Sequence, residues 1–171
     1  MHRSFDDRFV ALFDEHYPRL LRYLDRLSQD PDVAADVAQD AFVRLYQRGS
    51  VPDMPGAWLV SVAMNLFRNV RTTRSRRLRL LTKARVAYAQ ADPAPAPDAG
   101  VEARETRARV RLALDRIPDR ERRMLLLRAE GYSYREIAVA LDVNERSVGT
   151  LLARAARTFS EGFGEGDDAP R

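Results

Sequence analysis

Residues 133–157, SYREIAVALDVNERSVGTLLARAAR, predict two short amphipathic helices joined by a turn. Ser133 and Glu136 have the spacing of a capping box, which marks the start of the first helix. Asp142 can adopt the turn conformation, and Asn144 can cap the second helix. The apolar residues fall where a helix-turn-helix buries its internal face: Ile137, Ala138, Leu141, Val143, Val148 and Leu151.

The second helix of this pair is expected to carry an open polar face. The residues expected to point outward are Glu145, Arg146, Gly149, Thr150, Ala153 and Arg154. A helix with such a face fits the major groove of DNA. The alternative is a polar helical hairpin at the end of an all-α domain. The capping box, the small Ala138 at the helix crossing and the full apolar spacing together favour the helix-turn-helix.

Composition places the chain among ordinary globular proteins. It has 171 residues, 45% of them hydrophobic, which is enough for one domain or two small ones. No apolar run approaches the roughly 18 residues that a membrane-spanning helix needs, and the amino terminus lacks the apolar core of a secretion signal. The absence of cysteine excludes disulfides and thiolate metal sites, and it agrees with a cytoplasmic location.

The positive charge is concentrated in one stretch of the chain. The formal net charge is +4, and residues 68–85 contain no acid but eight bases: Arg68, Arg71, Arg74, Arg76, Arg77, Arg79, Lys83 and Arg85. Such a cationic surface attracts phosphate backbones. A solvated helix face or a surface for anionic lipid are the alternatives. The helix-turn-helix downstream favours nucleic acid.

Helical periodicity organises the rest of the chain into an all-α protein with two small domains. Three helices are expected in residues 1–88. The first carries on one face the apolar residues Phe5, Phe9, Leu12, Phe13, Leu20, Leu24 and Leu27. The second starts at Asp30-Pro31 and ends at Gly49, with an apolar stripe of Val33, Val37, Ala41 and Leu45, and the third runs from near Pro55 through Trp58, Val62, Leu66 and Val70. Residues 89–100 form a Pro/Ala-rich linker. Residues 101–160 form a four-helix domain with helices at 101–117 and 119–130 before the pair, and residues 161–171 form a disordered acidic tail.

Four segments, in this order, resemble a known family. They are HYPRLLRYLDRL (16–27), DVAADVAQDAFVRLYQR (32–48), PGAWLVSVAMNLFRNVRTTRSRR (55–77) and LDRIPDRERRMLLLRAEGYSYREIAVALDV (114–143). The chain resembles the extracytoplasmic-function group of the sigma-70 family, the small two-domain sigma factors of bacterial RNA polymerase. The first three segments resemble conserved region 2 and the fourth resembles region 4. The resemblance implies binding to core RNA polymerase and promoter-specific initiation of transcription.

The resemblance implies two surfaces in the amino-terminal domain. The second helix docks on the polymerase through Asp32, Asp36, Gln39, Asp40 and Arg44, although acids near a helix start are also typical of a solvated face. The third helix reads the melted minus-ten element with the amide of Asn65 and with Arg68, Arg71, Arg74, Arg76 and Arg77. Trp58 is expected in the core. Phe67 is left open between core and base stacking.

Region 4 departs from the family pattern at the helix that reads the minus-thirty-five duplex. Gly149 and Leu151 stand where the family usually carries basic residues. Basic contacts are therefore expected from Arg146, Arg154 and Arg157, base contacts from Asn144, Glu145 and Thr150, and a phosphate contact from Arg135. Leu125, Leu126 and Leu127 combine a core face with an apolar patch for the polymerase flap.

Two other classes of function fit the sequence less well. An enzyme is disfavoured: the only histidines are His2 and His16, the latter expected to be structural, and no phosphate loop, metal-ligand spacing or nucleophile elbow occurs, so no cofactor is expected. A stand-alone transcriptional regulator leaves Asn65 and the arginine-rich helix without a role. The expected partners are core RNA polymerase, promoter DNA and, as in many family members, an anti-sigma factor, with no membrane.

Overall fold

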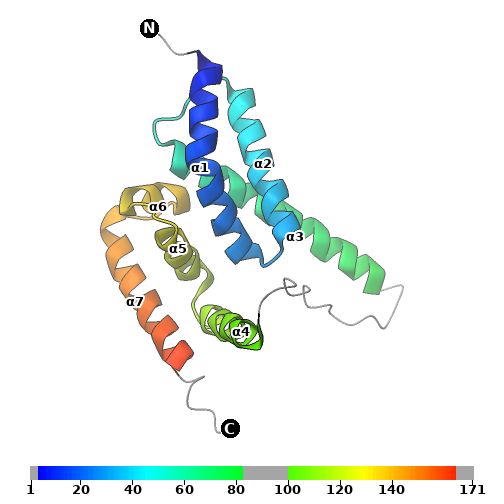
Figure 1. Ribbon diagram of the computed structural model, residues 1–171, viewed down its shortest axis with the longest axis vertical. Coiled ribbons are helices and arrows are strands. Elements are labelled where there is room, and N and C mark those ends of the chain that lie inside the picture. The colour runs from blue at the N-terminus through cyan, green and yellow to red at the C-terminus, as the bar shows by residue number, and fades with distance from the viewer. Residues whose placement is uncertain (1–3, 83–99, 165–171) are drawn as a thin grey trace. The chain divides into compact units, whose positions relative to one another are not determined.

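The computed structural model describes residues 4–82 and 100–164 (Figure 1). Within these two ranges the secondary structure consists of seven helices and contains no strand. The chain divides into two compact units, residues 1–93 and 94–171, with three helices in the first and four in the second. The predicted all-α class with two helical units is confirmed. The predicted linker at 89–100 lies outside the described residues except for Gly100.

The amino-terminal unit consists of α1 (Phe5–Ser28), α2 (Pro31–Arg48) and α3 (Pro55–Thr82). In Figure 1, α1 and α2 run side by side and α3 crosses them. The predicted limits of α2 are confirmed: the side chain of Asp30 accepts hydrogen bonds from the first backbone N–H groups, and Gly49 ends the helix with a φ of 69°. Ser4 and Asp7 form a capping box that starts α1.

Aromatic rings fill the contact between α1 and α2. Phe42 of α2 is buried and meets three rings of α1, with centroid distances of 6.2 Å to Phe9, 4.9 Å to Phe13 and 5.8 Å to Tyr17. Farther along α1, Leu20 and Leu24 are fully buried, as predicted from the apolar spacing. These contacts fix α2 on α1 and leave the other face of α2 exposed.

The apolar residues that the sequence analysis named along α3 do not form its buried face. The residues in the core are Ala57, Leu59, Val60, Ala63, Met64 and Phe67, whereas Val62 and Leu66 are half-buried and Val70 is exposed. Apolar residues lie on both faces of this helix, and small residues on the buried one let α3 approach its neighbours closely, where the hydroxyl of Tyr23 donates to the sulfur of Met64 at 3.3 Å. Trp58 is half-buried, with the guanidinium carbon of Arg48 5.8 Å from its ring centroid, so its predicted place in the core is wrong too.

The carboxy-terminal unit consists of α4 (Val101–Asp115), α5 (Asp119–Ala129), α6 (Tyr134–Leu141) and α7 (Glu145–Gly164). The long α7 packs against the other three helices. The local signals that the sequence carries are confirmed. Ser133 donates from its backbone N–H to Glu136 at 2.8 Å, and Asp142 takes a φ of 52° in the turn. Asn144 accepts the backbone N–H of Arg146 at 2.9 Å and so caps α7.

Helix α7 continues through Gly164, beyond the domain boundary predicted at residue 160. Packing against α4 extends the helix: a Cβ on Gly162 would lie 3.3 Å from the Cα of Ala113, and Arg109 donates to the backbone oxygen of Phe163 at 3.2 Å. The rest of the predicted acidic tail, residues 165–171, lies outside the described residues. Neither described range contains a helix that is long and apolar enough to span a membrane.

Candidate nucleic-acid interface

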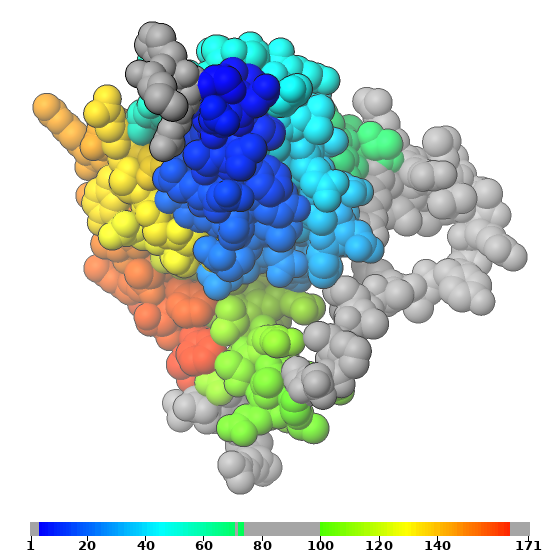
Figure 2. Space-filling view, turned by 45° about the horizontal axis from the view of Figure 1, so that its top comes forward, coloured from blue at the N-terminus to red at the C-terminus, as the bar shows by residue number. Residues whose placement is uncertain are grey.

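The pair α6 and α7 has one buried face and one open face. Ile137 and Ala138 of α6 and Val148 of α7 are buried as predicted, while Leu141, Val143 and Leu151 are half-buried. In Figure 2 the surface of α6 is yellow to light orange and that of α7 runs from orange to red. Because these apolar side chains hold α7 against α5 and α6, the opposite face of α7 is exposed.

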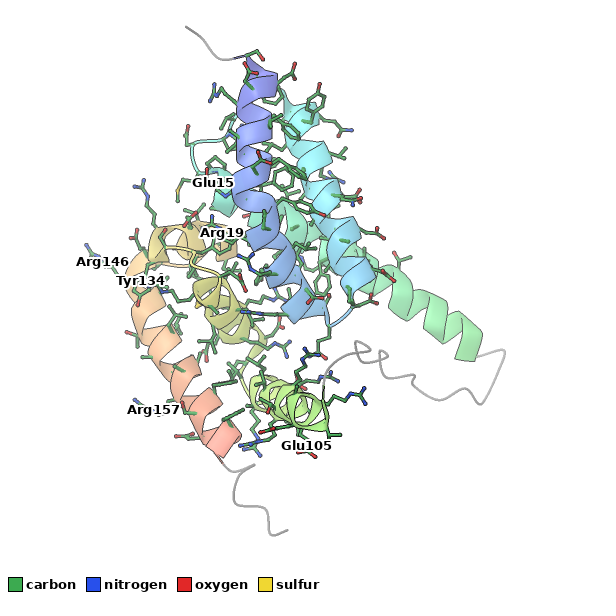
Figure 3. The ribbon with its side chains drawn as sticks, viewed as in Figure 1. Glu15, Arg19, Glu105, Tyr134, Arg146 and Arg157 are labelled. Carbon is green, nitrogen blue, oxygen red and sulfur yellow. The ribbon has the colours of Figure 1, made fainter. Side chains whose placement is uncertain are left out.

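The open face of α7 is hydrophilic and rich in arginine. The predicted outward residues Glu145, Arg146, Thr150, Ala153 and Arg154 are exposed, and so is Arg157. Figure 3 shows Arg146 near the amino end of α7 and Arg157 farther along it, both directed away from the helix. No side chain in residues 4–82 or 100–164 pairs with either arginine. This face therefore presents two unpaired positive charges for a phosphate backbone.

Tyr134, the first residue of α6, covers part of α7. Gly149 is half-exposed because the ring of Tyr134 lies 3.5 Å from the position that a Cβ would take. The ring remains 44% exposed, and the guanidinium carbon of Arg128 lies 5.5 Å from its centroid. Arg135 follows Tyr134 and is exposed at the start of α6. The ring of Tyr134 thus lies on the surface beside Gly149, one of the two positions at which the chain departs from the family pattern.

Arg154 has a partner that the sequence did not reveal. Its guanidinium donates to the carboxylate of Glu121, a buried residue in the first turn of α5. Hydrogen bonding to Glu121, together with the attraction of its negative charge, raises the pKa of Arg154 above its usual value. An acid at the start of a helix is typical of a solvent-exposed position that the helix dipole favours, so the sequence carried no signal for this long-range pair.

Asn144 is partly engaged in the fold. Its side-chain oxygen uses one of its two lone pairs to accept the N–H that caps α7, and its amide NH₂ has two N–H donors. The capping bond fixes the side chain at the amino end of α7, and the base contact at Asn144 stays a prediction.

On α3, the structure describes two of the predicted site residues in full. Asn65 and Arg68 are exposed, and Arg68 donates to the side-chain oxygen of Asn65. Phe67 is only 6% exposed. Of the two roles left open for it, core residue and base-stacking residue, the structure supports the core. The backbone of α3 continues as helix through the remaining predicted cations, whose side chains lie outside the description: Arg71, Arg74, Arg76 and Arg77.

The α2 polar face consists of Asp32, Asp36, Gln39, Asp40 and Arg44, all of which are exposed. It lies on the side of α2 away from the buried Phe42 and Leu45. Val43 and Tyr46 are also exposed beside this face, at 51% and 54%. The sequence did not single out these two residues as surface residues, because apolar side chains on an amphipathic helix are usually expected in the core. The face therefore combines charge with apolar surface, as protein interfaces do.

Two smaller predictions concern core residues. His16 is buried and contacts Arg19 at 3.1 Å through Nδ1, which confirms its structural role. The predicted core face of the three leucines is confirmed for Leu126 and Leu127, which are buried, and Leu125 is the half-exposed member of the three. Within the described ranges, no group of three or more histidine and acidic side chains could hold a metal ion.

Family models match both units of the chain. The model described as Sigma-70 region 2 matches residues 12–77, and the model described as Sigma-70, region 4 matches residues 107–159. Together these ranges include α2, most of α3, α6 and most of α7.

Curated relatives belong to the same family, and a solved structure shares the fold. The ECF RNA polymerase sigma factor SigL of Mycobacterium tuberculosis is 30% identical over 163 residues, which cover 87% of this chain and 85% of the relative. RfaY of Xanthomonas campestris pv. campestris, described as a probable RNA polymerase sigma factor, is 32% identical over 140 residues, 77% of this chain and 34% of RfaY. The sigma factor RpoE of Bartonella quintana, solved in complex with the anti-sigma factor NepR, matches the fold with a TM-score of 0.66 at 20% identity, over 92% of this chain and 97% of RpoE.

Proposed function

Because this chain belongs to the sigma-70 family, in its extracytoplasmic-function group, we propose that it binds core RNA polymerase and directs the enzyme to specific promoters. The observation that carries the proposal is the open arginine-bearing face of α7 in one unit, together with the exposed polar face of α2 in the other. A stand-alone regulator would need the first surface and not the second. In this proposal the chain acts in the cytoplasm and supplies no catalytic group, since the chemistry belongs to the polymerase.

The carboxy-terminal unit reads the upstream promoter element as duplex. We assign the base contacts to the amino end of α7 and the phosphate contacts to the exposed arginines around it. The residues of this surface are Arg135, Asn144, Glu145, Arg146, Thr150, Arg154 and Arg157. Arg128 and Tyr134 extend the surface beside Gly149. The domain that carries it spans residues 101–164, since α7 ends at Gly164.

The amino-terminal unit binds the downstream element as melted single strands. Asn65 and Arg68 share one exposed part of α3, and the arginines at 71, 74, 76 and 77 follow along the same helix. Single-stranded DNA requires cations along its backbone and polar groups for unstacked base edges. Since Phe67 is buried, aromatic stacking by that residue is not part of the proposal.

Core polymerase contacts the α2 polar face. Three acids and an arginine without a side-chain partner in the described ranges lie there beside exposed Val43 and Tyr46. Such a surface suits a partner helix with basic residues around an apolar strip. An anti-sigma factor is a further proposed partner, because RpoE of Bartonella quintana, which shares the fold, is held by one.

Gel filtration with purified core polymerase tests the polymerase contact. We expect the wild-type chain to co-elute with the core enzyme. The double change Asp36→Arg and Asp40→Arg should abolish co-elution, because it reverses the charge of the α2 polar face. The double change Asp6→Arg and Asp14→Arg, at exposed acids of α1 outside this face, alters the net charge by the same amount; it is the matched control and should co-elute.

Failure of the wild-type chain to co-elute would favour the stand-alone regulator. Equal loss for the control variant would show that net charge, and not the α2 polar face, governs the interaction.

A further inference from the structure

Glu121 and Arg154 form an ion pair between the first turn of α5 and the open face of α7. The side chain of Glu121 is 8% exposed, whereas that of Arg154 is 64% exposed. The pair therefore joins a buried carboxylate to a guanidinium on the surface that we assign to duplex DNA. The inference below rests on that proposed function.

The neighbouring arginines of α5 are engaged elsewhere. Arg122 bonds to Asp115 at 3.1 Å and to Asp119 at 2.8 Å, and Arg123 also pairs with Asp119. Arg120 donates to the backbone oxygen of Asp142 at 3.4 Å. Glu121 thus depends on Arg154 for the positive charge that a buried carboxylate requires.

Arg154 retains hydrogen-bonding capacity after this contact. A guanidinium has five N–H donors in a rigid planar fork, so a carboxylate that occupies one side leaves the other available. Arg146 and Arg157 have no such support, because no side chain in the described residues pairs with them. On binding DNA, these two arginines must lose rotamer freedom that Arg154 has already lost in the free protein.

We propose that Glu121 is a positioning residue for promoter recognition, which holds the Arg154 guanidinium on the open face of α7 so that its remaining N–H groups meet a backbone phosphate. Glu121 itself does not touch DNA. A phosphate is the ligand because the guanidinium fork matches phosphate oxygens, and because positions this far along a recognition helix lie beside the groove wall.

The test measures binding of the full chain, assembled with core polymerase, to a labelled duplex fragment. The fragment carries a promoter that the wild-type holoenzyme transcribes from random genomic fragments. Glu121→Gln and Arg154→Ala should each weaken binding about fivefold, and the double variant should be no weaker than either single one. Asp119→Asn, in the same turn of α5 but paired with Arg122 and Arg123, is the matched control and should bind like the wild type.

Salt dependence separates positioning from a purely structural role. Arg154→Ala should reduce the slope of log affinity against log salt by about 0.9, the value for one phosphate contact. Glu121→Gln keeps the positive charge of Arg154. It should therefore change the salt slope by less than Arg154→Ala does, although it still weakens binding. If Glu121→Gln does not fold, as judged by circular dichroism, Arg154→Lys serves instead: it keeps the charge, loses the fork and should weaken binding.

The following results would overturn the inference. Tighter binding by Glu121→Gln would mean that the carboxylate shields a cation, and unchanged binding would mean that Arg154 acts without it. Wild-type affinity for Arg154→Lys would exclude a role for the fork. A wild-type chain that binds neither core enzyme nor promoter would overturn the proposed function and this inference together, whereas normal wild-type binding with an unaffected Glu121→Gln overturns this inference alone.

Discussion

At the scale of single residues, the exposed arginines of α7 differ in what they contact. Arg154 is bonded to Glu121, and Arg146 and Arg157 have no side-chain partner in the described part of the chain. Arg146 lies at the amino end of α7, where a recognition helix meets base edges, and Arg157 lies about three turns farther along. Their positions on one helix predict different roles.

Arg146→Ala should relax sequence preference, and Arg157→Ala should not. A bidentate contact with a base contributes about 1–3 kcal/mol of discrimination, so the loss at Arg146 should appear at one position of the duplex. Arg157→Ala should weaken binding to all sequences and lower the salt slope by about 0.9. Binding to a set of single-base promoter variants measures both effects, and a uniform loss for Arg146→Ala would contradict its assignment to a base.

Phe42 is the residue on which the aromatic contact between α1 and α2 depends. It is 2% exposed, so Phe42→Ala should destabilise the amino-terminal unit by about 3–5 kcal/mol, as expected for a large core aromatic. Val43→Ala, at the adjacent exposed position, should stay within about 0.5 kcal/mol of the wild type. Urea unfolding followed by circular dichroism compares them, and similar losses for both variants would contradict the assigned core.

At the scale of helices, local chemistry sets most of the boundaries. Asp30 and Pro31 start α2, the Ser133 capping box starts α6, and Asn144 starts α7. Each signal depends on a few adjacent residues, and for that reason each could be predicted from the sequence. Helix existence and type were therefore predictable throughout the described ranges.

Which face of a helix is buried was less predictable. On α3, apolar residues occur on more than one side, and the choice depends on small residues that meet α1 and α2, a contact that spacing alone does not specify. The end of α7 was missed for a similar reason, because Gly162 is a packing residue against α4 and not a helix stop. Glu121 was missed as a site residue because its partner lies 33 residues away in the sequence.

Gly162 tests the packing between α4 and α7. A Cβ at this position would lie 3.0 Å from the Cδ of Arg116 and 3.3 Å from the Cα of Ala113. Gly162→Val should therefore destabilise the carboxy-terminal unit by about 1–3 kcal/mol, the usual cost of overpacking. Gly164→Ala, with no atom within 4 Å of the added Cβ, is the control. Thermal unfolding that shifts equally for both variants would argue against a close contact at Gly162.

At the scale of the whole molecule, each unit has its own core. In one unit α1, α2 and α3 pack together, and in the other α7 packs against α4, α5 and α6. An arginine-rich helix sequence in one unit and exposed arginines of α7 in the other suit the proposed contacts with two separated stretches of promoter DNA. The division predicts that each kind of DNA binding can be impaired alone.

Replacement of Arg74, Arg76 and Arg77 with alanine should weaken opening of promoter DNA and spare duplex binding by the carboxy-terminal unit. These residues belong to the arginine-rich part of α3, and single-stranded DNA needs such cations along its backbone. Permanganate reactivity of unpaired thymines reports opening, and filter binding of a duplex upstream element reports the second activity. Equal loss of both would contradict separate roles for the two units.

Transcription in vitro with purified core polymerase and this chain on random genomic fragments tests promoter-directed initiation. We expect the chain to make the core enzyme start transcripts at defined positions, and these positions to share two sequence elements at a fixed spacing. Transcripts that start at the same places without the chain, or none at any fragment despite binding to the core enzyme, would contradict this expectation.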